Sequence, residues 1–409
     1  MSEKAQSADL IPRAFIEGLR THIKNNYGPK SFVGKPWTEF DTSYFAKGIV
    51  RLNDSFTLSR SEKSLNYFND PIMRSGYLAY YLPVNAAKAA SIFLKHLTAK
   101  DLPGDSQTLR IVDFGSGPLT QTLGFLFALE QMLARGNCPL PKTVTVCAVE
   151  QNRRIIDEGR TLIKNYLAAS PLGTKIQLII KPITADLLRL RSGEPSDLLL
   201  FGNVLNEIPL RNEQNDLVFR LLNHWSAPNS LILFLEPAAK KISRDLQNLR
   251  DALLEKTDLK LLGPCLHHMT CPLNQVAKGD WCHFYQSWQA PLFIREFDRV
   301  TKLKKSVLMY SYLMFKRGSE AAKYRSNQFV AISDLLISKG RQEIIGCGPA
   351  GRIRFVRSNR DRSEDNHGFD LINRGTNFSA TNIELPKNPE LEYRSIVDRD
   401  TKFLLKAKS

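Results

Sequence analysis

The chain has 409 residues, of which 43% are hydrophobic, so it can bury the cores of about two or three domains. Its 57 Lys and Arg exceed its 41 Asp and Glu, and the net charge of +16 favours a polyanionic partner. No apolar run approaches the roughly 18 residues of a transmembrane helix, which excludes a membrane-spanning class.

The N-terminus carries acidic residues and no apolar segment, so it resembles neither a secretory signal nor a mitochondrial presequence. We therefore expect a bacterial-type cytoplasmic protein, and a mitochondrial location is less favoured. In a reducing cytosol cysteines bind metals or stay free, and structural disulfides are rare.

Residues 1–105 are predicted to form an N-terminal helical region. Apolar side chains recur at helical spacing over Ala14–Lys24, and Gly76–His96 is a second helical stretch that Pro83 interrupts.

Residues 106–260 are predicted to form a Rossmann-like α/β domain, because short apolar runs alternate with amphipathic segments. The apolar runs are Leu109–Phe114, Val144–Val149, Ile176–Ile180, Asp197–Phe201 and Ser230–Leu235. The amphipathic segments are Thr120–Ala134, Arg153–Ala168, Asn212–Trp225 and Lys240–Glu255. Five such runs in order predict a doubly wound parallel sheet.

Residues 261–305 are predicted to be a cysteine-rich metal-binding insertion that includes a last sheet strand at Phe284–Trp288. Residues 306–409 are predicted to form a basic, β-rich C-terminal domain, with the shape of a small antiparallel barrel. Its expected strands are Ser306–Phe315, Gln328–Ile337, Ile353–Arg357 and Gly368–Asn373.

A nucleotide-type turn follows the first predicted strand, where a doubly wound fold binds its cofactor. Asp113 ends the strand, and Gly115, Ser116 and Gly117 form a turn that lets the backbone approach a ligand closely. A nicotinamide dinucleotide requires a G-x-G-x-x-G/A turn for its pyrophosphate, whereas the third position here is Thr120. S-adenosylmethionine lacks the pyrophosphate, so the turn favours that cofactor.

Acidic and amide side chains at the ends of the later strands complete the predicted cofactor site. Glu150 ends the second strand, where it can accept hydrogen bonds from ribose hydroxyls, and Asp186 follows the third and can meet the adenine amine. Asn203, Asn206 and Glu207 follow the fourth, and they either line the pocket or cap a helix. No cysteine nucleophile stands there, so the sequence does not identify the catalytic residue.

Four cysteines are predicted to bind a metal. Cys265, Cys271 and Cys282 cluster with three histidines, and Cys347 is the fourth candidate because glycines flank it. Four thiolates suit a [4Fe–4S] cluster or zinc, and His267, His268 and His283 keep a mixed zinc site open. The plainer interpretation is that the cysteines are small core residues.

The excess of positive charge accompanies the cysteines, because residues 241–409 carry 29 Lys and Arg against 19 Asp and Glu. Two basic tracts predict binding to nucleic acid, since Lys and Arg contact phosphates and aromatic side chains stack on unpaired bases. The first tract contains Arg295, Arg299, Lys302, Lys304, Lys305, Lys316, Arg317, Lys323 and Arg325, with Tyr310 and Tyr312 interleaved. The second contains Arg352, Arg354, Arg357, Arg360 and Arg362. Either tract taken alone is also explained as an ordinary solvent-exposed face of the protein.

A set of motifs in this order resembles the methyltransferase-like family of small-ribosomal-subunit assembly factors, which has mitochondrial members and bacterial relatives. The motifs are DFGSGP at 113–118, GNVLNE at 202–207, LEP at 235–237, GPC at 263–265 with CP at 271–272, and WCHF at 281–284. RSGYLAYYLP at 74–83 is similar to the family's helical motif, and the resemblance covers roughly residues 75–360. Leu119 stands where the family's turn usually has glycine.

The resemblance implies a methyltransferase fold that binds S-adenosylmethionine, a [4Fe–4S] cluster on Cys265, Cys271, Cys282 and Cys347, and association with small-subunit rRNA and the pre-ribosomal small subunit. The leading hypothesis is accordingly an assembly or translation factor. One alternative is an active S-adenosylmethionine-dependent rRNA methyltransferase. A second is a zinc-dependent RNA-binding scaffold with a vestigial cofactor pocket.

Overall fold

The computed structural model describes residues 9–58, 67–102, 107–136, 139–208, 211–276, 279–318, 324–385 and 393–405. The chain divides into two compact units. The first comprises Met1–Glu207, Asn223–Ser226 and Gln286–Leu308, and the second comprises Ile208–Leu222, Ala227–Tyr285 and Met309–Ser409. Among the described residues, no helix combines the length and apolarity that crossing a bilayer requires.

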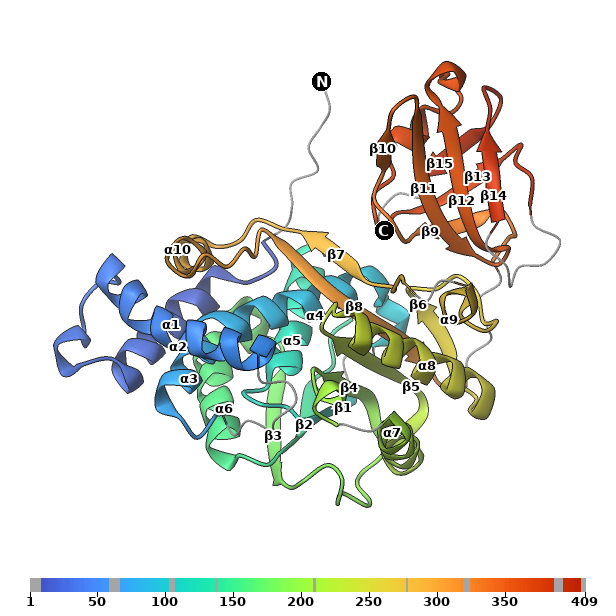
Figure 1. Ribbon diagram of the computed structural model, residues 1–409. Helices are drawn as coiled ribbons and strands as arrows, with labels where there is room; N and C mark the ends of the chain where they lie inside the picture. The colour runs from blue at the N-terminus through green and yellow to red at the C-terminus, as the bar shows by residue number, and fades with distance from the viewer. Residues whose placement is uncertain are drawn as a thin grey trace. The chain divides into compact units, whose positions relative to one another are not determined.

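The first unit contains the N-terminal helices and the helices that flank its strands (Figure 1). They are α1 (Arg13–Tyr27), η1 (Lys30–Phe32), α2 (Glu39–Leu58), α3 (Pro71–Gly76), η2 (Tyr77–Tyr81), α4 (Leu82–His96), η3 (Ala99–Asp101), α5 (Thr120–Ala134), α6 (Arg153–Ala168), η4 (Pro171–Thr174), η5 (Leu205–Glu207) and α10 (Leu292–Thr301). The predicted helix around Pro83 is divided, because a π-helical turn, η2, precedes α4. Proline lacks an N–H group and its ring crowds the carbonyl four residues earlier, which widens the preceding turn.

Four parallel strands form the sheet of the first unit. They are β1 (Thr108–Phe114), β2 (Thr143–Glu150), β3 (Gln177–Thr184) and β4 (Ser196–Gly202). β1 pairs with β2 on one side and β4 on the other, and β2 pairs with β3. The carboxyl ends of β1, β2 and β4 therefore meet at one edge, where a doubly wound fold places its ligand.

The second unit begins with further strands and helices of the α/β region. They are α7 (Arg211–Trp225), β5 (Ser226–Glu236), α8 (Lys240–Lys256), β6 (Lys260–Gly263), α9 (Pro272–Val276), β7 (Phe284–Ser287) and β8 (Val307–Lys316). β8 runs antiparallel to both β5 and β6, and β7 pairs with β8. Within the second unit these strands follow the order β5-β8-β6.

The position of β8 corrects one predicted strand assignment. The alternation over Ser306–Phe315 is that of an antiparallel strand, but the strand belongs to the α/β sheet and not to the C-terminal domain. Tyr310 and Tyr312 are buried on it, so they are core residues and not stacking platforms for bases. An alternating pattern identifies a strand without identifying its sheet.

The C-terminal sheet curls around an aromatic core (Figure 1). Its strands are β9 (Gln328–Ala331), β10 (Leu336–Ser338), β11 (Arg341–Gly348), β12 (Gly351–Ser358), β13 (Asn377–Thr381), β14 (Tyr393–Val397) and β15 (Lys402–Leu405), with η6 (Asn359–Asp361) and η7 (His367–Leu371) between them. The strand order is β14-β12-β11-β9-β13-β15, with β10 on β11. Phe329, Phe355 and Phe378 pack in the core. The predicted strand at Gly368–Asn373 is instead largely the 3₁₀ turn η7.

Candidate functional site

The glycine turn after β1 has the backbone conformation that close approach to a ligand requires. Gly115 and Gly117 have φ angles of 62° and 50°, and Leu119, at the start of α5, has a φ of 60°. The Ser116 N–H donates to the carbonyl of Val149 at 3.0 Å, which fastens the turn to β2. Left-handed backbone is strained for leucine and easy for glycine, so Leu119 is held there by its surroundings.

Asp113 lies under this turn with no solvent exposure. Its Oδ2 accepts hydrogen bonds from the Thr122 hydroxyl at 2.8 Å and from the Thr122 N–H at 3.2 Å, which ties β1 to α5. Its Oδ1 has no partner among the described residues. Burial raises the pKa of Asp113 to about 7, although the hydrogen bonds from Thr122 oppose that rise. Asp113 therefore anchors the turn from inside.

Glu150 lies beside the glycine turn, at the end of β2. One carboxylate oxygen accepts the Gly117 N–H at 3.1 Å, and the other accepts the Asn152 N–H at 3.1 Å. Burial raises the pKa of Glu150, while these backbone hydrogen bonds act in the opposite direction. Each oxygen keeps a second lone pair that can accept from a hydroxyl. The structure thus brings the predicted acidic side chain and the predicted turn together.

The other predicted cofactor residues lie at the same sheet edge or near it. Asn203 follows β4 with a φ of 57°, and a Cβ atom built on Gly115 would lie 2.6 Å from the side chain of Val204. Asn206 and Glu207 are exposed in η5. Asp186, after β3, accepts the Leu188 N–H at 3.0 Å within its own turn. The loop after β4 therefore contacts the glycine turn directly.

Aromatic residues from the N-terminal region also face this edge, and the sequence reasoning did not include them. The Phe68 ring lies 3.4 Å from the position of a Cβ atom on Gly117, and Tyr67 and Tyr77 stack with ring centroids 5.7 Å apart. Burial, and then the charges of Glu207 and Glu150, raise the pKa of Tyr67 and Tyr77. The signal available in the sequence was the RSGYLAYYLP motif, which supplies Tyr77.

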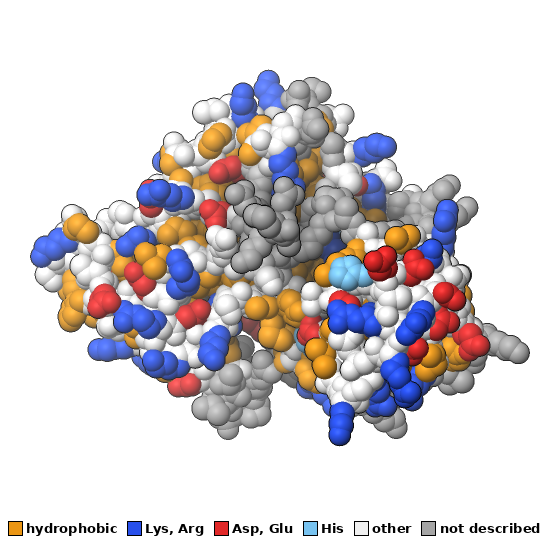
Figure 2. All heavy atoms as spheres, turned by 90° about the horizontal axis from the view of Figure 1, so that it is seen from above, with side chains coloured by type: hydrophobic (Ala, Val, Ile, Leu, Met, Phe, Trp, Pro, Cys, Tyr) orange, Lys and Arg blue, Asp and Glu red, His pale blue; other side chains and the backbone are white. Residues whose placement is uncertain are grey.

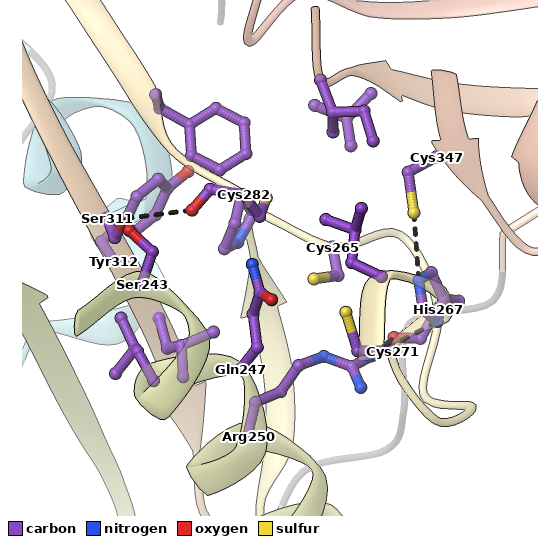
Figure 3. A pocket seen from close by; sticks show the side chains of 17 residues that line it. Ser243, Gln247, Arg250, Cys265, His267, Cys271, Cys282, Ser311, Tyr312 and Cys347 are labelled. Carbon is purple, nitrogen blue, oxygen red and sulfur yellow. Dashed lines mark hydrogen bonds between the residues drawn. The ribbon is translucent and has the colours of Figure 1, made fainter. Parts of the chain in front are cut away.

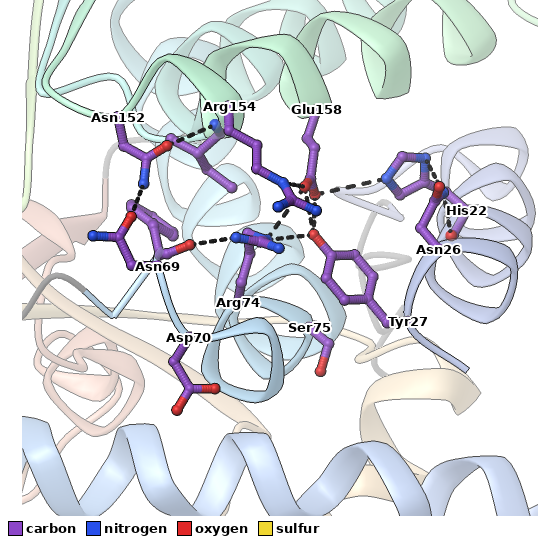
Figure 4. A network of polar contacts seen from close by, with 12 residues as sticks. His22, Asn26, Tyr27, Asn69, Asp70, Arg74, Ser75, Asn152, Arg154 and Glu158 are labelled. Atoms are coloured by element: carbon purple, nitrogen blue, oxygen red, sulfur yellow. Dashed lines mark hydrogen bonds and ion pairs between the residues drawn. The ribbon is translucent and has the colours of Figure 1, made fainter. Parts of the chain in front are cut away.

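A buried polar network holds the Phe68 segment against the turn (Figure 4). Arg74 donates from Nη1 to the Phe68 carbonyl at 2.6 Å and from Nε to the Tyr27 hydroxyl at 2.6 Å. Tyr27 donates to Glu158, which also pairs with Arg74 at 3.3 Å. Burial would raise the pKa of Glu158, but hydrogen bonds from His22 and Tyr27 and the charge of Arg74 lower it. The network joins α1, α3 and α6.

The four cysteines predicted to bind a metal line one pocket of the second unit (Figure 3). Cys265 follows β6, Cys271 precedes α9, Cys282 precedes β7, and Cys347 lies on β11 of the C-terminal sheet. The sulfur atoms of Cys265 and Cys271 lie close to Arg250 in Figure 3. The structure therefore gathers thiols from two loops and a strand at one place.

Hydrogen bonds fix the backbone around these thiols. Asp251 accepts the Cys271 N–H at 3.1 Å, and Arg250 donates to the carbonyls of His267 at 2.7 Å and Met269 at 2.9 Å. The His267 Nε2 lies 3.4 Å from the sulfur of Cys347. Burial lowers the pKa of His267 to about 3, so this imidazole is neutral at pH 7.

Burial keeps three of the thiols, those of Cys271, Cys282 and Cys347, protonated in the metal-free protein. It raises the pKa of Cys271 to about 12 and the pKa of Cys282 and of Cys347 well above the usual value. Within the described ranges, no three His, Cys, Asp or Glu side chains are grouped closely enough to hold a metal ion. Cys147 is buried in β2, apart from the pocket residues, and Cys138 lies outside the described residues.

The predicted RNA-binding arginines of the C-terminal sheet are largely internal, which corrects that prediction. Arg357 is 1% exposed and bound to Asn366, Gln342 and Asp370. Arg352 is 3% exposed and pairs with Asp280 at 2.9 Å. Arg354 is partly exposed and pairs with Glu343. A basic tract in sequence does not distinguish arginines that tie strands together from arginines that face solvent.

The first basic tract is divided between surface and interior. Arg295, Arg299, Lys302 and Lys304 are exposed on α10 and just after it, whereas burial lowers the pKa of Lys305. Arg299 pairs with Glu39 at 2.6 Å. Lys323 lies outside the described residues. Figure 2 shows basic side chains spread over the visible face with acidic ones among them.

Three solved methyltransferase structures are similar to this chain at low identity. NodS, an N-methyltransferase from Bradyrhizobium japonicum WM9 in complex with S-adenosyl-L-homocysteine, is 11% identical over 68% of this chain and 100% of its own, with a TM-score of 0.32. Residues 942–1257 of StiE O-MT are 11% identical over 67% and 90%, with a TM-score of 0.31. Haemonchus contortus phosphoethanolamine N-methyltransferase 1 is 12% identical over 70% and 52%, with a TM-score of 0.32.

No characterised protein in the curated set has a significantly matching sequence. The sequence profile of the family described as "Mitochondrial small ribosomal subunit Rsm22" matches residues 132–361, which is more than half of the chain. That range runs from the end of α5 to the end of η6 and includes all four pocket cysteines. The parallel strands β3-β2-β1-β4, with the glycine turn after β1 and the acid at the end of β2, have a Rossmann-like arrangement. The chain belongs to the mitochondrial small ribosomal subunit Rsm22 family.

Proposed function

We propose that this protein is a small-ribosomal-subunit assembly or translation factor that binds rRNA, S-adenosylmethionine and a [4Fe–4S] cluster. The observation that carries the proposal is the convergence of Cys265, Cys271, Cys282 and Cys347 on one pocket, within the range that the Rsm22 family profile matches. A segment of 81 residues lies between Cys265 and Cys347, so the convergence is a property of the fold and not of a short motif.

The cofactor would lie at the edge formed by the glycine turn and the end of β2. Glu150 would accept hydrogen bonds from the ribose hydroxyls, the backbone of Gly115–Gly117 would approach the cofactor closely, and Asp186 would face the adenine amine. Asn203, Asn206 and Glu207 would line the pocket beyond them. S-adenosylmethionine supplies an electrophilic methyl group. An unpartnered Asp113 Oδ1 under the turn supports a site built to hold a polar ligand.

The chemistry of the donors fits a cluster with four thiolate ligands. Each iron of a [4Fe–4S] cluster takes one cysteine, so the thiolates lie farther apart than four ligands of a single zinc ion do. The pocket cysteines line a common cavity, and this convergence of four thiols is the support for a cluster site. Arg250, buried beside them, offsets their negative charge.

The rRNA surface that the structure supports best is α10 and the residues just after it. Arg295, Arg299, Lys302 and Lys304 are exposed there, at positions where their charges can reach phosphates. This surface replaces the buried arginines of β12 as the proposed RNA contact.

The experiment is an anaerobic purification followed by iron, sulfide and zinc analysis, visible absorption, S-adenosylmethionine calorimetry, and co-sedimentation with small-subunit particles. We expect about four irons and four sulfides per chain, binding of the cofactor that Glu150→Gln weakens, and association with particles. Cys271→Ser is expected to lose iron, and Cys147→Ser, a buried cysteine outside the pocket, is the matched control. Stoichiometric zinc without iron would refute the cluster.

An active rRNA methyltransferase is the second candidate, and the methyltransferase fold is the observation that favours it. Transfer of labelled methyl groups from S-adenosylmethionine to small-subunit rRNA, lost in Glu150→Gln, would establish the enzyme. Particle association without methyl incorporation would establish the assembly factor alone.

A further inference from the structure

One face of α8 is directed at the four cysteines. Ser243, Gln247 and Arg250 line the cysteine pocket, and their spacing of four and then three residues places them on one side of the helix. Figure 3 shows the Gln247 amide extending from α8 into the space between the cysteines, and the Arg250 guanidinium extending toward Cys271. The helix therefore lines the pocket with polar groups, which a pocket that binds no polar ligand does not require.

Gln247 is the member of this face that the protein itself does not explain. The residue is 5% exposed, and neither the oxygen nor the nitrogen of its amide has a hydrogen-bond partner among the described residues. A buried amide without partners destabilises a folded protein, because it loses its hydrogen bonds to water and gains none. Such a side chain is explained when a ligand provides the missing partner.

Arg250 serves the pocket in two ways. Its Nη atoms hold the carbonyls of His267 and Met269, so it fixes the loop between Cys265 and Cys271. Its Nε has no partner among the described residues, and the residue is 1% exposed. An arginine guanidinium stays protonated in proteins. Arg250 is therefore a fixed positive charge beside the cysteine pocket.

We propose that Gln247 and Arg250 donate hydrogen bonds, from the Gln247 amide and the Arg250 Nε–H, to the sulfur atoms of the cluster that the four cysteines hold. Hydrogen bonds to sulfur and nearby charge are the groups by which a protein sets the stability and potential of an iron–sulfur cluster. This inference rests on the proposed function, because it requires the cluster to be present. It assigns two side chains of α8 the role of stabilising the cluster by hydrogen bonds, whereas the cysteines bind its iron atoms.

The charge balance gives the direction of the effect on potential. An oxidised [4Fe–4S]²⁺ core with four thiolates carries a net charge of −2, and addition of one electron gives [4Fe–4S]⁺ and a net charge of −3. A positive charge and hydrogen-bond donors at the sulfurs stabilise the reduced form more than the oxidised form. Their loss therefore lowers the reduction potential.

The first experiment uses Gln247→Met in the full-length protein, which replaces an unpartnered amide by an apolar side chain of similar length. We expect two effects of opposite sign. The variant should raise the urea midpoint of the metal-free protein, and it should release iron to a chelator about tenfold or more faster than wild type when the cluster is bound. Gln214→Met, which removes a buried glutamine that donates to the Ile208 carbonyl, is the control. It should lower the urea midpoint and leave iron release unchanged.

The second experiment is a one-electron titration with dithionite, followed by electron paramagnetic resonance. Gln247→Met and Arg250→Lys should each shift the potential downward, by about 59 mV for a tenfold change in the ratio of reduced to oxidised cluster. Arg250→Lys keeps the charge and loses the Nε–H donor, so it tests the hydrogen bond without removing the cation. Arg250→Lys also weakens the hydrogen bonds to the carbonyls of His267 and Met269, so this variant can fail to fold. In that case the potential of Gln247→Met alone tests the inference.

The outcomes separate this inference from the function on which it rests. Wild-type protein that holds no iron after anaerobic purification overturns both. A wild-type cluster whose iron release and potential are unchanged in Gln247→Met overturns the role of α8 and leaves the cluster standing. Faster iron release from Gln247→Met with an unchanged Gln214→Met supports the inference.

Discussion

The contact between α6 and the cofactor turn can be tested with one methyl group. Gly159 lies inside α6, and a Cβ atom added to it would lie 2.5 Å from both the carbonyl carbon and the oxygen of Pro118. These are backbone atoms of the turn that follows Gly117, so they cannot swing aside as a side chain can. Gly18, inside α1, provides the matched control, because an added Cβ atom there meets nothing within 4 Å.

The magnitudes follow from helix propensity and overpacking. Alanine is better than glycine inside a helix by about 1 kcal/mol, so Gly18→Ala should stabilise the protein by about 0.5–1 kcal/mol. Gly159→Ala gains the same helix-propensity contribution but forces the Pro118 backbone to move. Overpacking costs about 1–3 kcal/mol or more when backbone is displaced. We expect a net loss of about 1–2 kcal/mol, so the two variants should differ in stability by about 1.5–3 kcal/mol.

Urea unfolding of both variants measures this difference, with an unchanged slope as the check that the unfolding transition is the same. Calorimetry with S-adenosylmethionine measures the second consequence, since a displaced Pro118 alters the glycine turn. Gly159→Ala should bind the cofactor more weakly, and Gly18→Ala should bind it as wild type does. A Gly159→Ala protein that is stabilised as much as Gly18→Ala would refute the close packing of α6 on the turn.

Three further predictions concern the buried acid, the buried network and the basic helix. Because the pKa of Asp113 in the folded protein, about 7, lies above its ordinary value of 3.8, the folded state binds this proton more tightly than the unfolded chain, and stability should fall as pH rises from about 4 to about 7. Asp113→Asn stays neutral and should flatten that fall in urea titrations at several pH values, whereas an unchanged slope contradicts the assignment. Arg74→Met removes the buried cation of Glu158 and leaves only the exposed Arg154, 3.6 Å away, as a cationic partner. The substitution should cost about 3 kcal/mol, part of which Arg74→Met/Glu158→Leu should recover. If the destabilisation of the double variant equals the sum of the effects of Arg74→Met and Glu158→Leu measured alone, the two residues are not coupled. Arg295→Gln should lower the slope of log affinity for rRNA against log salt by about 1, and a slope that stays at the wild-type value removes α10 from the RNA surface.

Much of the first sheet was predictable because its signals are local. The helices predicted at Thr120–Ala134 and Arg153–Ala168 have those bounds in the structure. Asn152 precedes the helix, and its side chain accepts a hydrogen bond from the Ile155 N–H. An asparagine in this N-cap position marks the start of a helix in the sequence. Glycine, a following helix and an acid at the next strand end likewise identify a cofactor turn without any knowledge of packing.

The residues that sequence reasoning missed depend on contacts between distant segments. Phe68 reaches Gly117 because Arg74 holds its carbonyl, and neither residue is near the turn in sequence. The interior position of Arg357 depends on Asn366, Gln342 and Asp370, which no local pattern predicts. The four cysteines that the sequence assigned to one site line one pocket, and their binding of a metal stays a prediction. The role proposed for Gln247 depends on the direction of one face of α8, which the sequence pattern did not single out. The cytoplasmic location stays a prediction that cell fractionation can test.

The placement of β8 has a consequence for synthesis on the ribosome. β8 ends at Lys316 but lies between β5 and β6, which end at Glu236 and Gly263. A nascent chain that has just exposed β6 therefore lacks the strand that β6 pairs with, and the Cys265–Cys282 loop beyond it has no finished sheet to rest on. This sheet can close only after all residues up to Lys316 have left the exit tunnel, because domains form from segments already outside the ribosome. Chains that stall before that point would present an open strand edge to chaperones and to other chains.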